Sequence, residues 1–287
     1  FKPDTIDDLF DFAFENRVGL LLLDECEKRN LELSEKSQNN LSRLRKRRID
    51  TENVIIKLTN TLNKVAKGKW VLFKTIKPFP STPNDTDWFP FDIKDHKKLC
   101  NFLLDSGFDY LETAPLQTTL IDNTGTGQAD SDKRGGVWYI DCYKAPGADY
   151  FKYLDPSKLK RHLEFQDLNG TEIPVLSESA ELCSICYHNV FPERTYSIES
   201  FYLILYYLIK IKEKNLIDDF ILTVKENHLI KSVVSNLKVT EVLHLEYFGF
   251  SPDILQEVQG KLDFKNKKEG ELLRDQNFSL PYNFSVS

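Results

Sequence analysis

The stretch that most constrains this chain is residues 70–91, where two short apolar runs flank a proline-rich loop. The first run, residues 70–73 (WVLF), has the length and aromatic content of a buried strand. The loop that follows carries too many prolines for a helix or a central strand. The second run, residues 88–91 (WFPF), is again apolar and aromatic. The order strand, loop, strand therefore predicts part of a sheet here.

Two aspartates stand at the entrance to the second of these strands. Asp85 and Asp87 are separated by one residue, and residues i and i+2 of a strand point to the same face. Carboxylates on one face repel each other unless a cation lies between them. A divalent metal ion with oxygen ligands is the expected cation. The alternative is a structural turn, because paired aspartates are common at turns and strand ends.

A third aspartate favours the metal interpretation. Asp141 lies inside an otherwise apolar and aromatic run, residues 136–143 (GVWYIDCY), which reads as a buried strand. A buried carboxylate is costly to desolvate unless it is paired or binds metal. Two aspartates at a strand entrance and one from a neighbouring strand form a cage for one or two Mg²⁺ or Mn²⁺ ions, and such cages serve phosphoryl and nucleotidyl transfer.

This arrangement resembles the core of the polymerase-β-like nucleotidyltransferase superfamily. That core has a strand, a small-residue turn, a D-x-D at the next strand and a third Asp on a later strand. Most members have Gly-Ser in the turn, whereas this chain has Lys74 and Thr75, about ten residues before Asp85. The resemblance implies that Lys74 neutralises charge on a bound triphosphate and that Thr75 adds a hydroxyl contact. Ser81 and Thr82, in the same loop, are weaker candidates for phosphate contacts.

Two further stretches are similar to uncharacterised archaeal nucleotidyltransferase-like proteins. They are the loop of residues 74–85 (KTIKPFPSTPND) and the block of residues 175–202. The resemblance covers about residues 68–205. His188 lies in the second block, and both a role in nucleotide binding and a purely structural role stay open for it.

The resemblance implies metal-dependent transfer of NMP from an NTP to a hydroxyl acceptor, with release of pyrophosphate. Asp85 and Asp87 would hold Mg²⁺ on the triphosphate. Asp141 would bind the second ion and help to activate the acceptor hydroxyl for in-line attack. The acceptor, a small molecule, a tRNA or a protein, is not identified. The alternative is a catalytically inactive member that acts as an RNA- or protein-binding module, which the missing Gly-Ser turn favours. A structural helical protein with an incidental aspartate cluster is the third interpretation.

The overall charge limits the nucleic-acid hypothesis. A formal net charge of −6 argues against a protein that binds nucleic acid over its whole surface, though a local basic patch is compatible with it. Residues 43–48 (RLRKRR) form such a basic run. They could contact a phosphate-bearing acceptor, or they could form a solvated helix face or polar linker. The acidic residues around the run favour the second interpretation.

Cysteine usage and hydropathy bear on the compartment. The five cysteines are scattered, and no signal-peptide pattern is present, so we expect a reducing, cytoplasmic environment. Cys183 and Cys186 form one CxxC pair, which without a second pair is a weak zinc signal. The longest apolar run, residues 201–211, is too short to span a bilayer. We therefore expect no membrane partner.

The expected fold is α/β (α+β), with a small mixed sheet that carries the carboxylates at one edge. We predict an N-terminal helical segment (1–67), a catalytic core (68–176) and a C-terminal helical domain (177–287). Residues 123–136 are interpreted as a hairpin loop that orders over a bound substrate. The clearest amphipathic helix is predicted at residues 51–66. Its apolar stripe comprises Val54, Ile55, Leu58, Leu62 and Val65.

Overall fold

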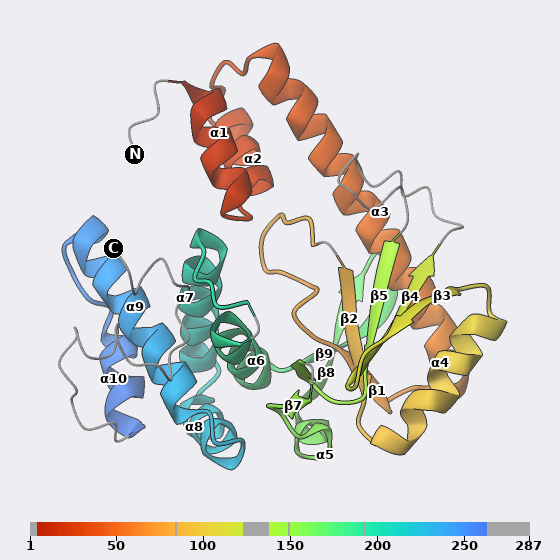
Figure 1. The fold of residues 1–287 in the computed structure, drawn as a ribbon. Helices are drawn as coiled ribbons and strands as arrows, with labels where there is room; N and C mark the ends of the chain where they lie inside the picture. The colour runs from red at the N-terminus through yellow and green to blue at the C-terminus, as the bar shows by residue number, and fades with distance from the viewer. Residues whose placement is uncertain (1–4, 84, 123–137, 149, 192, 263–287) are drawn as a thin grey trace. The chain divides into compact units, whose positions relative to one another are not determined.

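The computed structural model describes residues 5–83, 85–122, 138–148, 150–191 and 193–262. The fold is mixed α+β with helices flanking a mixed sheet, as the sequence predicts (Figure 1). Chain contacts divide it into two compact units. The first comprises residues 1–145 and 163–175, and the second comprises residues 146–162 and 176–287. The interpreted hairpin loop at 123–136 lies outside the described residues.

Three helices open the first unit: α1 (Ile6–Glu15), α2 (Gly19–Lys28) and α3 (Glu35–Ala66). The α1 helix starts in a capping box, where Thr5 accepts from the backbone of Asp8 and the Asp8 side chain accepts in return. The basic run and the predicted helix at 51–66 both belong to α3, which is longer than expected. Apolar side chains hold the first half of α3 against α1 and α2. They are Phe10, Leu20, Leu23, Leu41 and Leu44.

The sheet of the first unit has seven strands among the described residues, in the order β3-β4-β5-β2-β1-β9-β8. Their bounds are β1 (Trp70–Leu72), β2 (Asp85–Pro90), β3 (Asp109–Thr113), β4 (Gln117–Asp122), β5 (Trp138–Tyr143), β8 (Leu163–Leu168) and β9 (Thr171–Leu176). The β2 strand pairs antiparallel with β1 and parallel with β5, and β4 pairs antiparallel with β5. The two aspartate-bearing strands are thus central. The sheet is larger than expected, and the prediction that the carboxylates lie at its edge is wrong.

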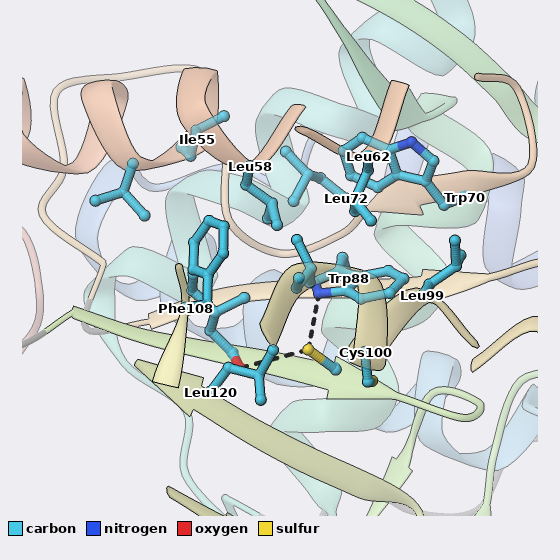
Figure 2. Close-up of a cluster of buried hydrophobic side chains, with 14 of the residues drawn as sticks. Ile55, Leu58, Leu62, Trp70, Leu72, Trp88, Leu99, Cys100, Phe108 and Leu120 are labelled. Carbon is cyan, nitrogen blue, oxygen red and sulfur yellow. Dashed lines mark hydrogen bonds between the residues drawn. The ribbon is translucent and has the colours of Figure 1, made fainter. Parts of the chain in front are cut away.

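One face of this sheet forms the main core with α3 and α4 (His96–Asp105) (Figure 2). Trp70 and Trp88 meet edge-to-face there, with ring centroids 6.0 Å apart. The Trp88 indole Nε1 donates to the Cys142 Sγ at 3.0 Å and so ties β2 to β5. Val65 does not join this core. It is 43% exposed, and Ala66, one residue further around the helix, is buried instead.

The contrast between Leu62 and Val65 gives a first test. Leu62 is fully buried, so Leu62→Ala should lower the free energy of unfolding by about 2–5 kcal/mol. Val65→Ala removes an exposed side chain and should change it by less than about 0.5 kcal/mol. Urea denaturation of the two variants measures both values. Equal losses would contradict the orientation of α3.

The second unit is mostly helical. Its elements are β6 (Gly147–Ala148), β7 (Phe151–Lys152), α5 (Pro156–Leu159), α6 (Glu178–Val190), α7 (Ile198–Glu213), α8 (Ile217–Glu226), α9 (Ile230–Phe248) and α10 (Asp253–Lys261). Asp155 caps α5 by accepting from the Ser157 backbone at 3.1 Å. Within the described ranges, no helix is both long enough and apolar enough to cross a membrane.

Candidate metal centre

The pairing of β2 with β5 brings the three predicted aspartates together. Asp87 and Asp141 are direct partners in the parallel register, and Asp85 lies one pleat away on the same face as Asp87. One carboxylate oxygen from each of the three lies within 4.8 Å of the others. The predicted clustering of these side chains is confirmed.

The opposite face of the same strands fixes this arrangement. Trp88 alternates with Asp87 on β2, and Cys142 alternates with Asp141 on β5; both Trp88 and Cys142 are fully buried in the core. Because a shift by one residue would turn every side chain to the other face, burial of these groups locks the register. The core therefore holds the carboxylates on the face away from α3 and α4.

Lys74 lies directly against the cluster. Its Nζ is 3.0 Å from the Asp87 Oδ2, and both side chains are less than 10% exposed. The ammonium also lies over the rings of Phe73, at 4.7 Å, and Tyr143, at 5.6 Å. The backbone of Lys74 has a φ of +58°, a conformation that glycine adopts without steric cost and other residues rarely adopt.

The other predicted nucleotide-binding residues lie in or beside this turn. The Thr75 Oγ1 accepts from the Asp87 backbone N–H at 2.9 Å and donates to the Phe73 carbonyl at 3.2 Å. Thr75 thus ties the turn to β2. Ser81 and Thr82 are half-buried in the loop before Asp85. Contact of any of these residues with phosphate stays a prediction.

Burial and mutual repulsion disfavour the ionised forms of two of the three carboxyl groups. Burial, together with the charges of Asp85 and Asp141, raises the pKa of Asp87 to about 8, although Lys74 acts to lower it. Burial and the charge of Asp85 raise the pKa of Asp141 to about 6. Positive charge close to these groups would favour their ionised forms.

The donor atoms fit a hard divalent cation. The Asp87 Oδ1 is buried and has no hydrogen-bond partner, and an unpaired buried carboxylate oxygen is costly. Three carboxylates at close range form an oxygen donor set of the kind that Mg²⁺ and Mn²⁺ prefer. Asp85, Asp87 and Asp141 could therefore hold such an ion.

Sequence reasoning missed two residues that hold Asp141. The Thr119 Oγ1 donates to the Asp141 Oδ1 at 2.8 Å, and the Gln117 Nε2 donates to the Thr119 Oγ1 at 3.0 Å. Both hydrogen bonds come from β4, where Thr119 is the antiparallel partner of Asp141. The run Gln-Thr-Thr at residues 117–119 is polar throughout and does not single out Thr119. Only the pairing of β4 with β5 shows that Thr119 faces Asp141.

Thr119→Val tests this support. Loss of an outer hydrogen bond to a metal ligand costs about 10–100-fold in metal affinity, so the variant should bind Mn²⁺ that much more weakly. The matched control is Thr118→Val, whose hydroxyl lies 3.4 Å from the Thr113 hydroxyl. Titration calorimetry measures both affinities. Equal affinity in the two variants would show that Thr119 does not position Asp141.

The basic run on α3 is extensively ion-paired. Arg45 contacts Asp24 and Glu27, both at 2.6 Å. Lys46 pairs with Asp50 and Arg48 pairs with Glu52, both at 2.9 Å. These contacts favour the solvated helix face over a phosphate-binding surface.

The remaining candidates are in the second unit. Cys183 and Cys186 are buried in α6, where desolvation raises the pKa of both thiols. His188 lies 3.4 Å from Glu193, which favours its structural role.

Over the part of the chain that the structure describes, the aspartate cluster is the one group of three or more side chains that could hold a metal ion. Neither the models of known protein families nor the curated proteins match this sequence.

Proposed function

We propose that this chain is a metal-dependent nucleotidyltransferase that moves NMP from an NTP to a hydroxyl acceptor and releases pyrophosphate. The observation that carries the proposal is the buried, unpartnered oxygen of Asp87 beside two more carboxylates on paired central strands. Such a cluster is unfavourable by itself and becomes favourable around a divalent cation.

Each residue of the centre has a defined part in this reaction. Asp85, Asp87 and Asp141 hold Mg²⁺ or Mn²⁺, which when bound neutralises phosphate charge and polarises a phosphoryl oxygen. Asp141, oriented by Thr119, also helps to activate the acceptor hydroxyl for attack on the α-phosphorus. Lys74 adds positive charge next to the phosphates. The acceptor is a small molecule, a tRNA or a protein.

The turn at Lys74 supports the relation to the polymerase-β-like superfamily. The position where most members have glycine is here a lysine with a φ of +58°, which is a glycine-like backbone. Thr75 supplies a hydroxyl where those members have serine. The residue types differ from the family pattern, but the backbone conformation suits it. We therefore propose that the chain belongs to this superfamily.

A second candidate, a catalytically inactive binding module for RNA or protein, is favoured by one observation. The Lys74 ammonium already lies 3.0 Å from Asp87, and an internal cation of this kind could replace the metal altogether. In that case the cluster would need no divalent ion and would catalyse nothing.

Labelling separates the two candidates. The protein is incubated with each α-labelled NTP, Mg²⁺ or Mn²⁺, and a total cell extract, and the fractions are tested for label. We expect one fraction to become labelled, and we expect a chelator to prevent it. Asp85→Asn should abolish labelling, whereas Asp105→Asn, an exposed change on α4, should leave it intact. Labelling that survives Asp85→Asn would contradict the proposed site.

A further inference from the structure

We propose that the carboxylate cluster takes a single divalent cation, because the Lys74 ammonium permanently occupies the place of a second one. This inference rests on the proposed function, which leaves the number of ions open. It makes Lys74 the residue that sets the stoichiometry of the site.

The spacing of the donor atoms suits one ion. With metal–oxygen bonds of about 2.0–2.1 Å, adjacent ligands of an octahedral ion lie about 2.9 Å apart and opposite ligands about 4.1 Å apart. The three aspartates offer oxygens within 4.8 Å of one another. Small side-chain rotations would therefore bring all three onto the same ion.

A second ion would need a carboxylate that bridges. Ions in two-metal sites lie roughly 3.5–4 Å apart, a spacing that a carboxylate spans by offering one oxygen to each ion. Asp87 has the central position, with Asp85 beside it on β2 and Asp141 opposite it on β5. Its Oδ1 has no hydrogen-bond partner, but its Oδ2 is 3.0 Å from the Lys74 Nζ. The lysine thus holds the oxygen that would reach the second ion.

Lys74 is held firmly in this place. Its side chain is 8% exposed, and its ammonium lies over two aromatic rings that themselves pack edge-to-face, those of Phe73 and Tyr143. The hydroxyl of Thr75 joins the turn to the Asp87 backbone. To leave, the ammonium would have to give up its ion pair and both ring contacts together.

The charge balance of the site also favours a single divalent ion. Three ionised carboxylates are matched by one ammonium and one divalent ion. Before a nucleotide brings its own negative charge, a second divalent ion would add two positive charges next to a fixed ammonium in a buried site, where like charges repel strongly. The cluster and its lysine together therefore form a complete site for one ion.

Manganese stoichiometry tests the inference. Mn²⁺ is titrated alone, and again with each of the four non-hydrolysable NTP analogues, and is followed by calorimetry and by electron paramagnetic resonance. Wild type should bind one Mn²⁺ per chain at the cluster and show no spin-coupled pair. Lys74→Met, which keeps the length and apolar contacts of the side chain without the charge, should bind a second Mn²⁺ at least about tenfold more tightly than wild type and show coupling. Lys67→Met, which removes an exposed lysine paired with Glu172, should behave as wild type.

Two coupled ions in wild type would overturn the inference while leaving the proposed function in place. One ion in Lys74→Met would also overturn it, because the lysine would not be what excludes the second ion. No Mn²⁺ binding in wild type under any condition would remove the proposed function as well. If Lys74→Met does not fold, Lys74→Gly, which suits the positive φ, replaces it in the same measurement.

Discussion

Asp87→Asn is expected to abolish the stabilisation of the first unit by Mg²⁺ or Mn²⁺. Asp87 is the most buried of the three aspartates, and its Oδ1 has no partner in the protein. A ligand that binds only the folded state stabilises it by about 2.7 kcal/mol at a concentration 100 times its dissociation constant. At that concentration of Mn²⁺, the free energy of unfolding of wild type should rise by this amount, and that of the variant should not change. Thermal unfolding with and without Mn²⁺ measures the difference.

The comparison is made within each variant, because Asp87→Asn also removes the partner of Lys74 and so changes stability without metal. Asp105→Asn is the control and should keep the full response to Mn²⁺. Transfer of NMP should fall by more than about 100-fold in Asp87→Asn, since loss of an outer-shell partner alone costs about 10–100-fold. A variant that is still stabilised by Mn²⁺ would show that the cluster is not the metal centre.

The pairing of Asp85 with Asp87 could be predicted because it depends on a short-range rule. Strand residues two apart share a face, so Asp85 and Asp87 had to point together once a strand was predicted there. Asp141 stood out because its own strand is otherwise apolar, but its place beside the other two follows from the pairing of β2 with β5. The contribution of β4 could not be predicted, since which strands are neighbours depends on pairing between distant segments. Thr119 therefore became recognisable as a support of Asp141 only from the register.

The order of the strands in the sheet was harder to predict, because it too depends on pairing between segments that are distant in the chain. The order β5-β2-β1 places the aspartates in the middle of the sheet, which local patterns do not report. Lys74 was predicted at the site from its place in the chain. Its ion pair with Asp87 and its two ring contacts come from the fold of the turn.

Helix α3 shows where periodicity is informative and where it is not. Residues 51–66 have a dense apolar stripe, and this part was predicted. Residues 35–50 are mostly polar and charged, and their buried apolar positions, Leu41 and Leu44, are covered by α1 and α2. So sparse a pattern does not distinguish a helix from a polar linker. Val65 was assigned to the stripe because a helical pattern fixes a face only to within about one residue per turn.

Trp88→Ala is expected to lower the free energy of unfolding by about 3–5 kcal/mol and to weaken Mn²⁺ binding as well. Trp88 is fully buried, follows Asp87 in the chain and pairs across the sheet with Cys142, which follows Asp141. Its indole also donates to the Cys142 sulfur. Removing it loosens the two strands whose spacing sets the distance between the carboxylates.

Trp70→Ala separates the two effects. Trp70 is equally buried, lies in the same core and contacts Trp88 directly, but it is on β1, which carries none of the three aspartates. Its loss of stability in urea denaturation should be similar, whereas its affinity for Mn²⁺, measured below the unfolding transition, should stay close to that of wild type. If both variants lose the same metal affinity, general destabilisation explains the effect. If only Trp88→Ala loses it, the packing between β2 and β5 is what holds the carboxylates at the spacing a metal ion needs.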